Sequence, residues 1–252
     1  GSWGWSNAGL IVDGEESLLI DTLYDLQLTA QMLHKMRAAE PVANTIGTLV
    51  NTHANGDHCH GNELVAGAQI IASTASAMEM GELPPETMAA IMQSTPELGP
   101  LGEYLQHCFG QFRFDSIQFT PPTRTFDDTM DLRVGDKMVH LIEVGPAHTR
   151  GDVLVHCPSD RVVFTGDILF IDSTPVMWQG PVTNWIKACL CIEEMDTELI
   201  VPGHGPITDK HGVAKVRRYL QYVHDQARSR YDAGLNAYEA AKDIELSEYS
   251  AW

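Results

Sequence analysis

Thr52-His53-Ala54-Asn55-Gly56-Asp57-His58 is the stretch that decides the fold of this chain. It follows the apolar run 46–51, whose composition is typical of a short buried strand. Two imidazoles, an amide and a carboxylate therefore crowd onto one short loop, and the end of a strand projects such groups into one cleft. Nitrogen and oxygen donors of this kind are ligands that zinc and related metals take in proteins. The stretch predicts a metal-binding loop directly after a strand.

Three later segments place further ligand types at strand ends, each beside a glycine that lets the backbone come close to an ion. They are Gly145-Pro146-Ala147-His148-Thr149-Arg150-Gly151-Asp152, Thr165-Gly166-Asp167 and Val201-Pro202-Gly203-His204-Gly205-Pro206. A single histidine is usually a packing or surface group, which is our interpretation of His34, His107, His140, His156, His211 and His224. For His60 we favour a role facing a pocket or solvent over metal ligation, and for Cys59 a packing role.

These four segments, in this order and at this spacing, resemble the metallo-β-lactamase superfamily. The resemblance covers nearly the whole chain, from the strand pair that ends at Asp21 to His204. The first motif of that superfamily is His-x-His-x-Asp-His, and here it reads His53-Ala54-Asn55-Gly56-Asp57-His58. The chain therefore has an asparagine where the superfamily has its second histidine.

The resemblance implies a ligand set and a cofactor. One ion would be held by His53, Asn55 and His148, and the other by Asp57, His58 and His204, with Asp167 bridging the two. The implied cofactor is one or two divalent metal ions, zinc first and manganese or iron as alternatives. Asp57 would also be catalytic, because it would orient the attacking water and relay its proton.

Asn55 changes the expected strength of the first site. An amide oxygen is neutral and is a weaker donor than an imidazole nitrogen, so we expect the His53/Asn55/His148 site to bind zinc less tightly. The chain would then hold one metal, or prefer manganese or iron. The alternative is that Asn55 ligates through its oxygen and both metals bind normally.

Hydrophobic periodicity predicts alternating strands and helices in two similar halves. The predicted strands include 46–51, 69–73 and 199–202, and the predicted helices include 24–37, 182–195, 209–234 and 236–243. Sheets inside and helices outside make the fold class α/β, and the resemblance makes it a four-layer αββα sandwich. We expect a single domain, 1–252, with a helical lid insert at about 74–116, after the first metal loop, and C-terminal helices at about 209–243.

Composition and charge limit which binding partners and which cellular compartment we expect. The formal net charge is −18 with no basic cluster, so a nucleic-acid partner is not expected. No apolar run approaches the roughly 20 residues that span a bilayer, so no membrane partner is expected either. Five cysteines without framework spacing favour a reducing compartment. With no visible signal peptide, we expect a cytoplasmic protein.

The resemblance implies a metallo-hydrolase that activates water, and the insert suggests its substrate. Flexible thioethers and aromatic rings in the insert suit a bulky, mostly apolar ligand, although their spacing also suits core packing. We therefore expect cleavage of an ester, thioester or lactone of a small molecule, either free or linked to a carrier protein or CoA. Candidate substrate contacts are Trp3, Trp5, Arg150 and Trp178, and Arg150 could hold a carboxylate or ketone oxygen.

Other functions stay open at this point. Residues 3–9, the Asn-Gly-Asp-His variant and residues 175–181 look like bacterial superfamily members of secondary metabolism, some of which are cyclases or thioesterases for aromatic polyketides. A metal-dependent cyclase that closes a ring by aldol chemistry is therefore the second hypothesis. An iron-dependent oxidoreductase is a third. A β-lactamase is less favoured, because the insert is large and no export signal is visible.

Overall fold

The computed structural model describes residues 4–252 and shows two sheets enclosed by helices. Within these residues the strands are β1 Gly9–Asp13, β2 Glu16–Ile20, β3 Thr48–Val50, β4 Gln69–Ser73, β5 Arg124–Phe126, β6 Thr129–Val134, β7 Lys137–Glu143, β8 Val153–Cys157, β9 Val162–Phe164 and β10 Leu199–Val201. The α-helices are α1 Leu26–Ala39, α2 Gly56–Cys59, α3 Thr74–Met80, α4 Pro85–Ser94, α5 Pro100–Phe109, α6 Val182–Glu194, α7 Lys210–Asp232 and α8 Ala237–Asp243.

Each half of the chain builds one five-stranded sheet. The first sheet has the order β1-β2-β3-β4-β5, in which β1 and β2 are antiparallel and the later neighbours are parallel. The second has the order β10-β9-β8-β7-β6, in which β10 and β9 are parallel and the other neighbours are antiparallel. The carboxyl ends of β3, β9 and β10 therefore lead into the loops that carry the expected ligands.

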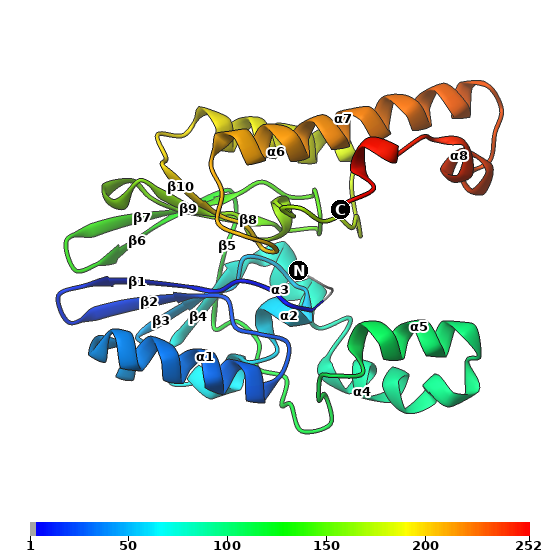
Figure 1. The fold of residues 1–252 in the computed structure, drawn as a ribbon. Coiled ribbons are helices and arrows are strands. Elements are labelled where there is room, and N and C mark those ends of the chain that lie inside the picture. The colour runs from blue at the N-terminus through cyan, green and yellow to red at the C-terminus, as the bar shows by residue number, and fades with distance from the viewer. Residues whose placement is uncertain (1–3) are drawn as a thin grey trace.

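The side chains of β2 point alternately to the two faces of the first sheet, and this shows how the layers form. Leu18 and Ile20 pack between the two sheets, whereas Leu19 faces the opposite side and packs with Leu33 of α1, because successive side chains of a strand point to opposite faces. The outer face of the second sheet is covered by α6 and α7 through a cluster that includes the fully buried Trp185. Figure 1 shows the resulting order of helix, sheet, sheet and helix. The predicted four-layer α/β sandwich is confirmed.

The insert between β4 and β5 has a small core of its own. Its helices α3, α4 and α5 occupy the segment at about 74–116 in which the sequence predicts a helical insert, and α4 and α5 lie beside the sandwich in Figure 1. Tyr24, just before α1, contacts Phe112 and Phe114 with ring centroids 5.0 and 4.9 Å apart. This aromatic cluster anchors the insert to the first half of the molecule.

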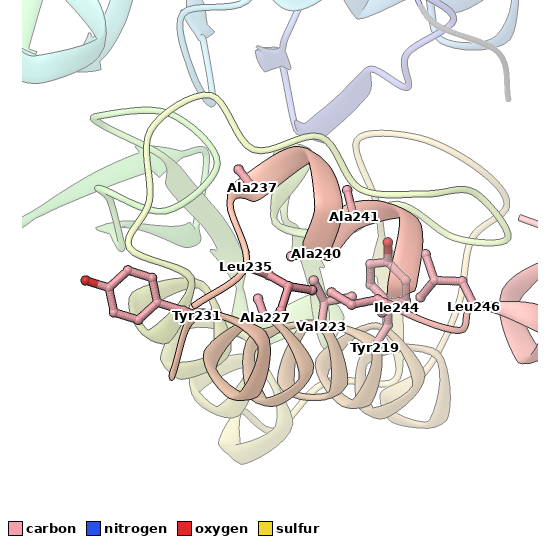
Figure 2. A pocket seen from close by; sticks show the side chains of 10 residues that line it. All are labelled: Tyr219, Val223, Ala227, Tyr231, Leu235, Ala237, Ala240, Ala241, Ile244 and Leu246. Atoms are coloured by element: carbon pink, nitrogen blue, oxygen red, sulfur yellow. The ribbon is translucent and has the colours of Figure 1, made fainter. Parts of the chain in front are cut away.

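The C-terminal part folds back along α7. Asp209 begins this helix by accepting hydrogen bonds from the backbone N–H groups of His211 and Gly212. An apolar cavity of about 460 Å³ lies between α7 and α8, and Figure 2 shows the side chains that line it. Beyond α8 the chain returns so that Trp252 packs on Tyr219, with ring centroids 5.1 Å apart. Among the described residues, no helix has both the length and the apolar character needed to cross a bilayer.

Candidate metal centre

The motif loop is fixed to the end of β2 by Asp21. The Asp21 carboxylate accepts hydrogen bonds from the backbone N–H and the hydroxyl of Thr52, both at 2.7 Å. It also accepts one from Nδ1 of His58 at 2.8 Å. Asp21 has a left-handed backbone conformation (φ 60°), which aspartate and asparagine adopt more readily than most residues. One buried carboxylate thus positions both ends of the loop.

Hydrogen bonds to Nδ1 orient the rings of two histidines, His53 and His58. Nδ1 of His53 lies 3.0 Å from the Thr52 hydroxyl oxygen, whose proton is donated to Asp21. Because Asp21 also receives Nδ1 of His58, both rings carry their proton on Nδ1 and present Nε2 forward. Neither Nε2 atom has a hydrogen-bond partner among the described residues, although both are buried.

Backbone carbonyls orient the other two histidines, His148 and His204, in the same way. Nδ1 of His148 donates to the carbonyl of Val176 at 2.6 Å, and Nδ1 of His204 donates to the carbonyl of Trp5 at 3.0 Å. These histidines come from two different loops of the second half, yet both present Nε2 to the site. An Nδ1–H group bonded to a carboxylate, a carbonyl or water is typical of metal-ligating histidines.

Asp167 lies at the centre of the four rings. Its Oδ1 is 3.1 Å from Nε2 of His58, and its Oδ2 is 3.2 Å from Nε2 of His204. The same Oδ2 lies 3.3 Å from His148 and 3.7 Å from His53. Two ligand atoms of one tetrahedral zinc ion are about 3.3–3.6 Å apart, given bonds of about 2.0–2.2 Å. These separations are close to those of ligands that share ions.

Asp57 completes the cluster on the side of His204, with its Oδ2 3.3 Å from Nε2 of that ring. Two overlapping groups can hold a metal ion, namely His53, His58 and Asp167, and Asp57, His58 and His204. The second group is the one that the resemblance implies, whereas the first brings His53 together with His58 and Asp167. An unpaired buried polar atom costs free energy, so the orphaned nitrogens and Asp167 Oδ1 fit a bound cation.

Asn55 lies where the resemblance places it, beside His148. Its side-chain oxygen Oδ1 is 2.7 Å from Nε2 of that histidine. Since Nδ1 of His148 donates its proton to a carbonyl, Nε2 of the neutral ring carries a lone pair and faces another acceptor, the amide oxygen. Two acceptor atoms that face each other in this way fit two ligands of one cation.

The electrostatic field of the cluster keeps its carboxylates ionised. Burial by itself would raise the pKa of Asp167, but the imidazoles of His204, His58 and His53 hold it well below its ordinary value. Burial would likewise raise the pKa of Asp57, but the imidazoles of His58 and His204 lower it to about 2. Both carboxylates are therefore anionic at neutral pH, which is the form that binds a cation.

Glycines make this close packing possible at two positions. A Cβ atom at residue 203 would stand 1.9 Å from Oδ1 of Asp167, and a Cβ atom at residue 56 would stand 2.4 Å from the His60 ring. Gly203 therefore allows the loop after β10 to approach Asp167. Gly56 allows His60 to lie over the first turn of α2.

A pocket of about 700 Å³ opens over the cluster. Its floor includes Asn55, Asp57, His148, Asp167 and His204. Its walls include side chains of the insert and of the loops that flank the metal centre, namely Tyr24, Leu83, Met88, Leu105, Phe109, Phe170, Val176 and Trp178. The pocket is therefore polar at its floor and largely apolar on one side, and the insert supplies much of that side.

The tryptophans that the sequence suggested as substrate contacts do not all line the pocket. Trp178 lines the pocket and is 58% exposed. Trp5 is not among the described lining residues; its ring contacts Phe112 at 5.3 Å and its carbonyl positions His204. Trp3 lies outside the described residues. Trp5 thus has a positioning role in this structure, although the sequence suggested a substrate contact.

Arg150 also lines the pocket, but it is already bonded. Its two terminal guanidinium nitrogens lie 2.6 and 2.9 Å from the carboxylate oxygens of Glu82. Its backbone N–H donates to Glu79 at 3.0 Å. The contact with a substrate carboxylate that the sequence suggested would therefore require Glu82 to move away.

Sequence reasoning missed three residues around the site. Asp21 closes an apolar strand and could have been noticed as a carboxylate at a strand end, the same signal that identified Asp167. Tyr24 and Trp252 line the pocket, and no local pattern shows this, since tertiary packing brings them there. His60, for which the sequence favours a role facing a pocket or solvent, is 6% exposed and lies in the lining against Tyr24, and burial lowers its pKa to about 4.

Comparison with known proteins agrees with this geometry. The sequence model described as the metallo-beta-lactamase superfamily matches residues 1–204. The human acyl-coenzyme A thioesterase MBLAC2 is 24% identical over 211 residues, which cover 79% of this chain and 72% of that protein. A metallo-beta-lactamase from Pontibacter korlensis superposes with a TM-score of 0.65 at 19% identity, over 86% of this chain and 87% of that one. The sec-alkylsulfatase Pisa1 from Pseudomonas sp. gives 0.74 at 15% identity, over 98% of this chain and 44% of that one.

Proposed function

The chain belongs to the metallo-beta-lactamase superfamily of metallo-hydrolases, and we propose that it cleaves an ester, thioester or lactone bond of a bulky, mostly apolar small molecule. The observation that carries this proposal is the position of the His/Asp cluster at the floor of a largely apolar pocket. Such a site combines a place for the reacting carbonyl with a wall for an apolar acyl group.

The donor set suits zinc, which takes imidazole and carboxylate ligands, and manganese or iron are the alternatives. We propose that His53, Asn55 and His148 hold one ion and that Asp57, His58 and His204 hold the other, with Asp167 between them. Bound ions of this kind polarise a carbonyl group and lower the pKa of water. Asn55 makes the first of these sites the weaker one, because its donor is a neutral amide.

The protein's own groups would then orient the reaction. Asp57 lines the pocket with its side chain 13% exposed, and its low pKa keeps it ready to accept a hydrogen bond from water. It would hold the attacking water and take its proton as the bond to the carbonyl carbon forms. The apolar side chains of the insert would hold the acyl group. Burial of about 100 Å² of apolar surface there contributes about 2.5 kcal/mol to binding.

The relatives support the thioester among the three bond types. Human and bovine proteins named acyl-coenzyme A thioesterases match 79% of this chain at 24% and 25% identity. We therefore expect thioesters to be cleaved faster than oxygen esters with the same acyl group.

The test is hydrolysis by the purified protein loaded separately with zinc, manganese or iron. Thioesters, oxygen esters and lactones of rising acyl size are supplied, and free acid is measured. His58→Ala and Asp167→Asn should lose activity and bound metal together. His140→Ala serves as the matched control, because His140 lies on β7 and pairs with Asp131 outside the site. Absence of hydrolysis across the whole panel with every metal would reject the proposal.

One observation favours a second function, a metal-dependent cyclase for an aromatic polyketide intermediate. The pocket wall contains several aromatic rings, among them Tyr24, Phe109, Phe170 and Trp178, which can stack on a flat substrate. Product mass distinguishes the two reactions. A cyclase converts a poly-β-ketone by ring closure without releasing a free acid, whereas a hydrolase releases the acid and the alcohol or thiol.

A further inference from the structure

The charged residues at the mouth of the pocket are mostly acidic. Among the described residues that line it, Asp57 and Asp167 belong to the metal cluster, and Glu79, Glu82 and Arg150 lie at the rim. The rim therefore has two carboxylates for one cation. A ligand that reaches out of the pocket passes this rim.

The rim cation, Arg150, is neutralised by a neighbouring carboxylate on the surface. Glu82 takes both terminal guanidinium nitrogens of Arg150, at 2.6 and 2.9 Å, in the bidentate geometry that a substrate phosphate or carboxylate would otherwise use. Glu79 accepts the backbone N–H of Arg150, and no side-chain cation of residues 4–252 lies within ion-pair distance of its carboxylate. The Arg150–Glu82 pair leaves the rim with a net negative charge.

A second cation near the mouth is also engaged. Lys215 lies 5.2 Å from the ring of Trp252, which lines the pocket, but its ammonium group is 3.1 Å from the Asp172 carboxylate. Across residues 4–252, the side chains that line the pocket thus include no arginine or lysine that is not already paired with a carboxylate, and the ions proposed for the floor would meet the reacting carbonyl. The net charge of −18 adds a repulsive field at longer range.

From this charge balance we infer that the pocket takes an uncharged acyl donor, and that it discriminates against a thioester whose leaving group carries phosphates. The inference rests on the proposed function, because it concerns the leaving group of that same reaction. Phosphate groups are bound by arginine, lysine or free backbone N–H groups, and the rim offers carboxylates instead. The chain therefore differs in its leaving group from the relatives named acyl-coenzyme A thioesterases.

The first experiment compares two thioesters that share the acyl group and the pantetheine arm, decanoyl-CoA and decanoyl-pantetheine. The zinc-loaded protein should give a kcat/KM about tenfold or more higher for decanoyl-pantetheine at about 0.01 M ionic strength, where charges act over about 30 Å. The ratio should shrink as salt is added, because screening weakens the repulsion. An equal or higher kcat/KM for decanoyl-CoA at low salt would overturn the inference.

The second experiment releases Arg150. Glu82→Gln removes one rim charge and frees the guanidinium, so the ratio of kcat/KM for decanoyl-CoA to that for decanoyl-pantetheine should rise several-fold. Glu15→Gln is the matched control, since it changes the net charge equally in the exposed turn between β1 and β2. An equal rise with Glu15→Gln would show that total charge, and not the rim, determines the preference, and the inference would be wrong.

Binding separates this inference from the proposed hydrolysis. S-decyl-CoA and S-decylpantetheine are thioethers that cannot be cleaved, and calorimetry measures their affinities for the same zinc-loaded protein. Tighter binding of S-decylpantetheine supports the inference even if neither thioester is hydrolysed, a result that would count against the proposed function alone. Tighter binding of S-decyl-CoA, or binding of neither compound, overturns the inference.

Discussion

Asn55 is the side chain whose replacement tells most about the centre. A histidine at this position would offer an imidazole nitrogen in place of an amide that contacts His148 Nε2 at 2.7 Å. Asn55→His should therefore raise the number of tightly bound zinc ions per chain from one to two. Where both ions already bind, it should lower the dissociation constant of the weaker one by about tenfold or more. Elemental analysis after dialysis against a weak chelator measures the first, and competition with a zinc indicator measures the second.

Asn55→Gln provides the control, because it keeps the amide and should not raise the zinc content. Two tightly held zinc ions in the unchanged protein would contradict the proposal that Asn55 weakens one site.

His60 makes stability depend on pH. Its pKa is about 4 in the folded chain and 6.5 ordinarily, because burial disfavours the charged ring. A base with a lowered pKa stabilises the fold fully above 6.5, and this contribution is lost as the pH falls toward 4. From pH 7 to pH 5 the wild type should lose about 2 kcal/mol of unfolding free energy relative to His60→Gln, which does not titrate. Urea unfolding of both proteins at the two pH values gives the difference; identical pH profiles would show that the pKa of His60 is not lowered.

For single residues, the sequence could indicate the proposed metal ligands because each belongs to a short local motif. His53, Asp57 and His204 all follow strands and stand beside glycine or other ligands. Asp21 was not identified, because its role depends on contacts with Thr52 and His58, more than thirty positions away. The pairing of Arg150 with Glu82 was also not predictable, since it depends on how the insert lies against the loop that carries His148.

The insert is the element whose stability can be changed separately from the sandwich. Phe114 is 4% exposed and packs on Tyr24 in the aromatic cluster that joins the insert to the first half. Phe114→Ala should cost about 3–5 kcal/mol locally, as large-to-small changes of buried rings do. Hydrogen exchange should show faster exchange in α4 and α5, while β2 and β3 keep their protection.

Phe119→Ala is the companion substitution, because this ring is 38% exposed and lies outside the aromatic cluster. It should leave the exchange of α4 and α5 unchanged. Uniform loss of protection in the sheets of Phe114→Ala would mean that the insert and the sandwich unfold as one unit.

Most elements were predictable from periodicity, and α6 and α7 lie within a few residues of their predicted ranges. The helices show a strong repeat of apolar residues, and the buried strands are short apolar runs bounded by polar loops. The path of the chain after α8 was not predictable. Its return to the pocket depends on packing of Trp252 and Tyr249 against Tyr219, which lies thirty or more positions earlier in the chain and belongs to no local repeat with them.

For the whole molecule, bound metal should stabilise the fold. The proposed ligands come from both halves, so only the folded chain brings them together, and binding that excludes the unfolded state adds to stability. At a free zinc concentration about a thousandfold above the dissociation constant, the gain is about 4 kcal/mol. Chelation should then lower the Tm by about 10 °C for a chain of this length.

Differential scanning calorimetry with and without chelator checks this shift. His58→Ala should show little response to chelator, whereas His140→Ala should respond like the wild type. A Tm that does not change on chelation would contradict tight binding across the two halves.

The division of the proposed ligands between the two halves also orders events during biosynthesis. Residues 53–58 leave the ribosome early, whereas His204 follows β10, near the end of the second sheet. A nascent chain can hold an ion only through its first loop until the second sheet has closed over the first. Capture of metal at full affinity is therefore a late step that reports successful folding of both sheets. A polypeptide that stops before β10 should remain poor in metal.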